Sequence, residues 1–348
     1  MSNCVTRRSS IWRAPKWVSA TAFTALVMIF PGAPAQAADD TQSARPRREI
    51  TVDALSVVKL KSTAVPNARS STTLGQQREG TGVVIDSKGL VMTIGYLITE
   101  AEKIELSTTD GKVFPATVVA NDYATGLGLV RALTPLPVKP VDFGESASAA
   151  ERELVLIVGF DGVAPAYIVS KRPFVGYWEY ILDEAIFTAP ATVNWQGAAL
   201  LSREGKLLGI GSLAVGDAMG KQSAVPGNMF VPIDVLKPVL GEIIAKGRST
   251  AKSRPWIGIY TQEVQGNVII TRVSPDSPAD EGGLKVGDVI VGVRGQSIKG
   301  QADFYTKLWQ SGDAGVEIPL EVLKGNRIEK YTVKSIDREQ YSRPKPVY

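Results

Sequence analysis

Short segments rich in β-branched residues recur from residue 50 to residue 246, and this spacing limits the possible folds more than any other feature. The first segment covers Val52–Lys61, and turn-forming residues such as Asp86–Gly89 and Ser202–Gly205 separate others. Only one amphipathic helix is expected in this region, at Val235–Ala245. Many evenly spaced short strands predict a mainly β fold, a sandwich or a barrel.

A second, smaller unit is expected at residues 255–337, after a polar linker at 247–254. Its pattern starts with a strand at Trp256–Tyr260 and continues through a Pro- and Gly-rich stretch to a helix at Gln301–Gln310. Two closing strands follow, and a polar tail covers residues 338–348. The chain of 348 residues therefore has room for a β domain and a separate α+β domain.

The first 37 residues have the pattern of a secretory signal. Basic residues come first, an apolar run follows at Val18–Phe30, and Ala35-Gln36-Ala37 resembles a cleavage site. We expect a cleavable signal peptide at residues 1–37, a flexible leader at residues 38–49 and a periplasmic protein. Contact with a membrane is expected only if the signal stays uncleaved.

The charge and the composition exclude several classes of function. The formal net charge of +4 matches the four basic residues of the signal segment, so no basic patch points to nucleic acid. The chain contains no histidine, and Cys4 is its only cysteine. No metal site, no cofactor and no histidine-dependent catalysis is therefore expected.

The segment SPDSPADEGGLKVGDVIVGVRGQSI, at residues 274–298, resembles the PDZ domains attached to bacterial periplasmic proteases. Such domains bind extended C-termini by strand addition, and backbone amides hold the terminal carboxylate. The resemblance places the peptide site at a loop and on one helix face: Trp256, Ile257, Gly258, Ile259, Phe304 and Leu308. Alternatively, Ile257, Phe304 and Leu308 simply fill the domain core.

Residues 80–131 and 186–234 resemble the trypsin-fold domain of HtrA/DegP-type proteases, which implies two antiparallel β-barrels. The motifs that carry the resemblance are LVMTIGYLITE, NDYATGLGLV and NWQGAAL. In this register the positions of the catalytic His, Asp and Ser are taken by Tyr96, Gly126 and Gln196. A phenol, a hydrogen atom and an amide supply neither a base near neutral pH nor a nucleophile.

The resemblance therefore implies an inactive HtrA-like pseudoprotease that binds peptides or the C-termini of unfolded proteins through its PDZ domain. Two alternatives stay open. The chain could be an active serine-type endopeptidase with a rewired site, for which Ser202 and Lys206 are the nearest candidates. It could also be a silent subunit, in a homo-oligomer or beside an active HtrA-type protease.

Overall fold

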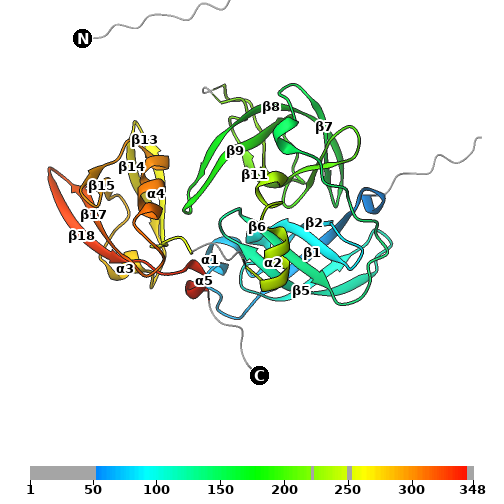
Figure 1. Ribbon diagram of the computed structural model, residues 1–348, viewed down its shortest axis with the longest axis horizontal. Helices are drawn as coiled ribbons and strands as arrows, with labels where there is room; N and C mark the ends of the chain where they lie inside the picture. Colours follow the sequence, from blue (N-terminus) through cyan, green and yellow to red (C-terminus); the bar gives the residue numbers. More distant parts are fainter. Residues whose placement is uncertain (1–51, 221–222, 249–252, 343–348) are drawn as a thin grey trace, which may run out of the picture. The chain divides into compact units, whose positions relative to one another are not determined.

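The computed structural model of the protein describes residues 52–220, 223–248 and 253–342. The expected signal peptide and leader lie outside the described residues. A first closed β-barrel has the strand order β1-β2-β3-β6-β5-β4 (Figure 1). Its strands are β1 (Val57–Ala64), β2 (Gln77–Val84), β3 (Leu90–Ile94), β4 (Ala101–Ser107), β5 (Val113–Asp122) and β6 (Leu127–Ala132).

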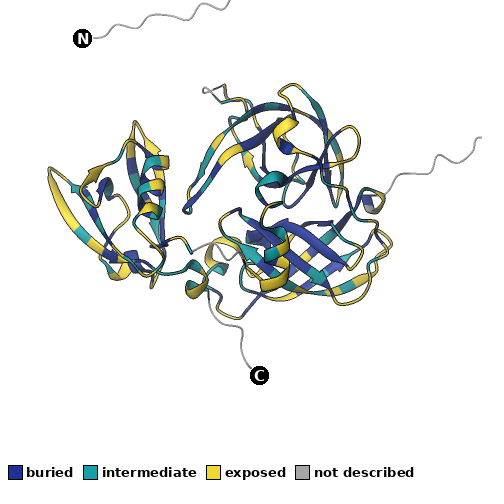
Figure 2. Ribbon diagram, in the orientation of Figure 1, coloured by how far each residue is buried: buried dark blue, intermediate teal, exposed yellow. Residues whose placement is uncertain are grey.

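A second closed barrel follows, with the order β10-β11-β12-β9-β8-β7. Its strands are β7 (Leu154–Gly159), β8 (Gly162–Gly176), β9 (Tyr180–Ala189), β10 (Ala199–Leu201), β11 (Leu207–Val215) and β12 (Gly227–Pro232). Figure 2 shows buried residues, in dark blue, along the strands of both barrels. The mainly β prediction with two antiparallel barrels is confirmed.

The remaining strands form one antiparallel sheet with the order β13-β14-β15-β17-β18, and β16 pairs with β15. They are β13 (Ile259–Val264), β14 (Asn267–Val273), β15 (Val289–Val293), β16 (Gln296–Ser297), β17 (Glu317–Lys324) and β18 (Arg327–Lys334). Strand β13 lies at one edge of this sheet. An edge strand presents unpaired backbone groups, to which another extended segment can add.

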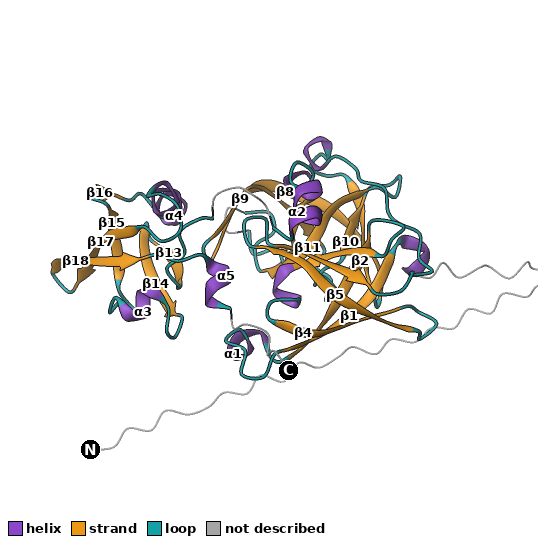
Figure 3. Cartoon of the chain, turned by 60° about the horizontal axis from the view of Figure 1, so that its bottom comes forward, coloured by secondary structure: helices purple, strands orange, loops and turns teal. Residues whose placement is uncertain are grey.

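Helices are short and few among the described residues (Figure 3). The α-helices are α1 (Ser71–Leu74), α2 (Leu240–Lys246), α3 (Pro278–Glu281), α4 (Gln301–Gln310) and α5 (Arg338–Tyr341). Single 3-10 turns occur at η1 (Val52–Leu55), η2 (Gly95–Leu97), η3 (Ser146–Ser148) and η4 (Ile233–Val235). The expected helix at Gln301–Gln310 is present as α4.

Three sequence expectations about single elements are wrong in detail. The strand expected at Trp256–Tyr260 begins only at Ile259, as β13. The helix expected at Val235–Ala245 is instead the turn η4 followed, after a gap, by α2. Pro238 lies in that gap, and a proline disfavours the helical conformation of the residue before it. The strand expected from Val52 starts only at Val57, because η1 occupies the first four residues.

The expected hairpin turns are present. At the first, the Asp86 carboxylate accepts hydrogen bonds from the backbone N–H groups of Lys88 and Leu90, both at 2.8 Å. Gly89 has a φ of +76°, a conformation that glycine adopts without strain. These local bonds explain why the turn residues of β2–β3 could be recognised from the sequence.

Candidate functional site

The three positions predicted to replace the catalytic residues line one cavity of about 370 Å³. Tyr96, Gly126 and Gln196 are far apart in the sequence, and the two barrels bring them to the same cavity. Aromatic rings fill much of its wall: Trp178, Tyr180 and Trp195. The sequence reasoning singled out Trp195 but missed Trp178 and Tyr180.

Tyr96 lies in η2, and its polar groups are already bonded. The hydroxyl donates a hydrogen bond to the carbonyl oxygen of Ser212 at 3.0 Å. Its own carbonyl accepts one from Nη1 of Arg78, a buried arginine, at 3.1 Å. Burial raises the pKa of Tyr96 well above 10. The residue is therefore a neutral phenol whose proton is engaged, and it has no capacity to act as a base at neutral pH.

Gly126 leaves no room for a side chain. It has a φ of +76°, and a Cβ added there would lie 3.1–3.2 Å from the ring of Tyr180. The Tyr180 hydroxyl donates a hydrogen bond to the carbonyl oxygen of Thr125 at 2.9 Å, which holds the ring in place. An aromatic side chain from β9 thus fills the space beside Gly126.

The backbone around Gln196 is held by bonds between the barrels. The N–H of Thr81 donates to the carbonyl oxygen of Gln196 at 2.8 Å. Gly197 has a φ of +73°, and a Cβ there would lie only 2.2 Å from the carbonyl oxygen of Thr81. The N–H of Asn194 donates to the Thr192 hydroxyl at 3.3 Å. That N–H is therefore bonded inside its own loop. It is not available to stabilise the negatively charged oxygen of a reaction intermediate, as the N–H groups of an oxyanion hole do.

Ser202 and Lys206, the candidates for a rewired site, lie in the turn between β10 and β11. The Ser202 hydroxyl donates to the carboxylate of Glu204 at 2.8 Å, and this bond lowers the pKa of Glu204. The backbone N–H of Lys206 points to the same hydroxyl oxygen at 3.4 Å, while its side chain is exposed. The buried Ser202 hydroxyl thus donates to a carboxylate that, with its lowered pKa, is a weak base.

The second predicted site is the loop before β13, where backbone N–H groups converge on one carboxylate. The N–H of Gly258 donates to Oε1 of Glu179 at 2.9 Å, and that of Ile259 donates to the same atom at 3.2 Å. The N–H of Ile257 lies 3.4 Å from both oxygens. Gly258 has a φ of +90°, and a Cβ there would lie 2.3 Å from Cβ of Ser277. The loop therefore has the geometry of a carboxylate site.

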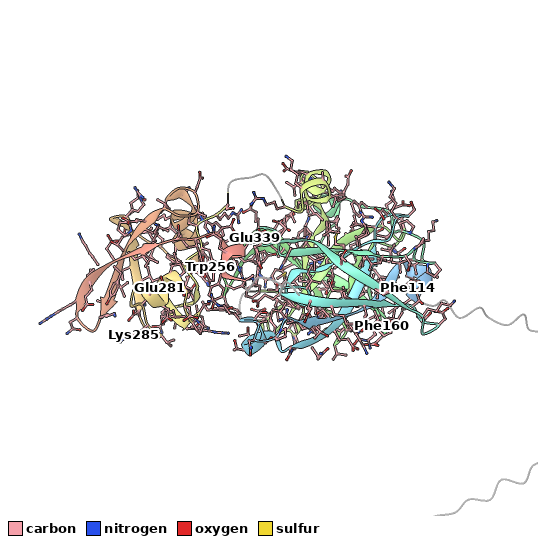
Figure 4. All side chains as sticks on the ribbon, turned by 90° about the horizontal axis from the view of Figure 1, so that it is seen from below. Phe114, Phe160, Trp256, Glu281, Lys285 and Glu339 are labelled. Carbon is pink, nitrogen blue, oxygen red and sulfur yellow. The ribbon has the colours of Figure 1, made fainter. Side chains whose placement is uncertain are left out.

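The side chains predicted to line the peptide groove are buried. Ile257, Phe304 and Leu308 are each 0% exposed, and Ile259 is 1% exposed. Trp256, labelled in Figure 4, packs against Tyr341 with ring centres 4.7 Å apart and the ring planes tilted by 45°. These side chains belong to the domain core, as the alternative reading had it, and a direct contact with peptide stays a prediction.

Glu179 was missed by the sequence reasoning. It occupies the turn between β8 and β9, and its own sequence neighbours give no hint of the loop that it contacts. Burial raises the pKa of Glu179 to about 7, although the three backbone donors and Arg338 lower it. Within the described part of the chain, no three His, Cys, Asp or Glu residues are grouped closely enough to hold a metal ion.

Two family models match the chain. A trypsin-like peptidase domain matches residues 80–210, and a PDZ domain matches residues 255–335. With the two barrels and the edge-stranded sheet, these matches define a trypsin-fold domain followed by a PDZ domain. The chain therefore combines a trypsin-like peptidase domain with a PDZ domain, and curated relatives of it are named as HtrA- and Deg-type serine proteases.

The relatives are named as serine proteases. The putative serine protease HhoA of Synechocystis sp. is 26% identical over 287 residues, covering 74% of this chain and 70% of the relative. Serine endoprotease DegS of Haemophilus influenzae is 28% identical, covering 62% and 65%. Periplasmic pH-dependent serine endoprotease DegQ of Escherichia coli is 26% identical, covering 71% and 57%. The chain thus spans somewhat less than two thirds of the length of DegS and DegQ.

Among solved structures, a variant of the HtrA-type protease AlgW with a tripeptide has a TM-score of 0.50 to this chain. It is 21% identical, and the match covers 84% of this chain and 95% of that one. At this identity the likeness concerns the fold. Within the described residues, no helix combines the length and the apolar character needed to cross a membrane.

Proposed function

We propose that the protein is a catalytically inactive member of the HtrA/DegP family that binds the C-termini of peptides or unfolded proteins through its PDZ domain. The observation that carries the proposal is the loop at Ile257–Ile259, whose backbone N–H groups converge on a carboxylate. A C-terminal carboxylate presents the same two oxygens to such a loop.

The cavity lined by Tyr96, Gly126 and Gln196 supports the proposal that the protein is catalytically inactive. Tyr96 is a neutral, partly buried phenol, Gly126 has no side chain, and Gln196 is an amide. None of the three can deprotonate a nucleophile or attack a peptide bond. Losing the nucleophile or the base alone lowers the rate of such enzymes by about a millionfold.

We propose that the protein is located in the cell envelope, in the periplasm. The support is the signal-like pattern at residues 1–37 together with relatives that are named as periplasmic. The proposed partners are peptide or protein C-termini. Assembly with itself or with an active HtrA-type protease is also proposed, and light scattering of the protein alone and mixed with such a protease tests it.

Binding is tested by fluorescence anisotropy with a labelled peptide of about ten residues that ends in an apolar residue. The matched control is the same peptide with an amidated C-terminus, which keeps the side chains and removes the charge. We expect the free acid to bind at least about tenfold more tightly, because charge-assisted bonds to backbone N–H groups are lost with the amide. Equal binding of acid and amide would contradict recognition of C-termini.

A further inference from the structure

The turn between β8 and β9 contains a residue type that the backbone geometry of the turn does not favour. Tyr177, Trp178 and Glu179 form a three-residue turn, and Glu179 has a φ of +60°. Glycine is the usual residue at the left-handed position of such turns, because it adopts a positive φ without steric conflict. The presence of glutamate here needs an explanation outside the turn.

The contacts of the Glu179 side chain provide that explanation. Its carboxylate reaches the loop at residues 257–259, where Oε1 accepts from Gly258 at 2.9 Å and from Ile259 at 3.2 Å. Glu179 is only 6% exposed. The oxygen that a C-terminal carboxylate would place against these N–H groups is thus already supplied by the chain itself.

The backbone of the same turn also pairs with the edge strand of the PDZ sheet. The N–H of Thr261, on β13, donates to the carbonyl oxygen of Tyr177 at 3.0 Å. The Tyr305 hydroxyl, from α4, donates to that carbonyl at 3.3 Å. The bonded carbonyl lies two residues before Glu179. A bound C-terminal peptide pairs with an edge strand in this manner, through its backbone upstream of the carboxylate.

Apolar residues on both sides of the turn complete the contact. Val175, near the end of β8, and Ile181, near the start of β9, pack against the PDZ core that contains Ile257, Phe304 and Leu308. The turn is therefore held by a carboxylate contact, a backbone hydrogen bond and apolar packing. These are the three kinds of contact that a peptide in the groove would use.

We propose that residues 177–179 act as an internal substitute for a C-terminus, which occupies the peptide site and must leave before an external C-terminus can bind. The proposal rests on the proposed peptide-binding function and adds its regulation. When the internal turn occupies the site for more than about nine tenths of the time, the apparent affinity for a peptide falls by at least about tenfold.

The decisive variant is Glu179→Gly, which removes the carboxylate and suits the positive φ of the turn. The matched control is Glu184→Gln, which removes a carboxylate from the strand that follows the turn, β9, where Glu184 pairs with Lys171 at the surface. Both are compared with the unmodified full chain in anisotropy titrations with the free-acid and amidated peptides. We expect Glu179→Gly to bind the free acid at least about tenfold more tightly, and Glu184→Gln to behave as the unmodified chain.

A second measurement does not depend on any peptide. Hydrogen exchange at the amides of Ile257, Gly258 and Ile259 should be at least about tenfold faster in Glu179→Gly than in the control, because these N–H groups lose their acceptor. Unchanged exchange would overturn the internal substitute. If exchange accelerates but no protein binds the free acid better than the amide, the internal contact stands and the peptide-binding function fails. If the unmodified chain binds the acid as tightly as Glu179→Gly, the regulation fails and the binding function stands.

Discussion

The Oε1 atom of Glu179 and the amide nitrogen of Gly258 lie 2.9 Å apart, although the two residues are 79 positions apart in the sequence. This bond joins the turn between β8 and β9 to the loop that precedes β13. It makes one glutamate a ligand of the loop that the PDZ resemblance assigns to peptide carboxylates. The bond also makes the loop sensitive to the protonation state of Glu179.

Peptide binding is expected to strengthen as the pH rises. Burial raises the pKa of Glu179 from 4.5 to about 7 in the closed state, whereas release into water restores an ordinary pKa. The closed state is therefore favoured most when Glu179 is protonated, and it loses this advantage as the pH rises through about 7. Oε1 accepts the two shorter contacts, from Gly258 and Ile259, and Oε2 is reached only by the N–H of Ile257 at 3.4 Å, so Oε2 can carry the proton.

The measurement is the affinity for the free-acid peptide from about pH 5 to pH 8, a range in which the peptide carboxylate stays ionised. We expect an increase of up to about a hundredfold, and a much flatter profile in Glu179→Gln. Other titratable or charged groups that face Glu179 or line the same cavity are Tyr305, Arg254, Asp122, Tyr123, Arg248, Asp337, Arg338 and Glu339. An identical slope in Glu179→Gln would assign the effect to them instead.

Gly258→Ala should destabilise the PDZ domain more than an alanine at another glycine of the same domain. Its Cβ would lie 2.3 Å from Ser277, at a φ of +90°, so strain and a clash add to about 2–4 kcal/mol. The matched control is Gly266→Ala, which has a φ of +79° and open space, and which should cost about 1 kcal/mol. Thermal unfolding followed by circular dichroism measures both, and equal losses would rule out the clash.

Tyr96→Phe should lower the stability without changing any hydrolysis. The substitution removes the hydroxyl that donates to the buried Ser212 carbonyl, which corresponds to about 1–2 kcal/mol. The control is Tyr167→Phe, at a tyrosine that is 52% exposed, where no measurable change is expected. Chemical denaturation compares the two. A peptidase activity that disappears in Tyr96→Phe would show instead that this phenol is catalytic.

Gln196→Ser should not create a protease. The new hydroxyl would enter a cavity in which Tyr96 keeps its proton and Gly126 has no side chain, so neither of these two positions supplies a base to activate it. Cleavage of labelled casein and labelling by a serine-directed fluorophosphonate measure the outcome. An active HtrA-type protease is the positive control, and Ser202→Ala reports on the alternative turn site. Rapid cleavage by the unmodified chain that Ser202→Ala abolishes would support the rewired site.

The elements that local sequence determines were predictable. Alternating β-branched segments and turn residues such as Asp86 and Gly89 act over a few positions, so the mainly β fold followed from them. The helix expected at Val235–Ala245 does not form as one element, because Pro238 disfavours the helical conformation of the residue before it. The cavity shared by Tyr96, Gly126 and Gln196 was expected from the family resemblance, which supplied the long-range arrangement.

By itself, the sequence determined which chemistry is missing, since a chain without histidine and with Tyr96, Gly126 and Gln196 at these positions carries no ordinary triad. It did not reveal the partner of Glu179. That contact forms only when the turn after β8 meets the loop before β13. The residues next to Glu179 in the sequence do not indicate it. The physical reason is the distance along the chain over which each interaction acts. Hydrophobic periodicity and turn chemistry act over a few residues, whereas the burial of a carboxylate against N–H groups far away in the sequence depends on tertiary packing.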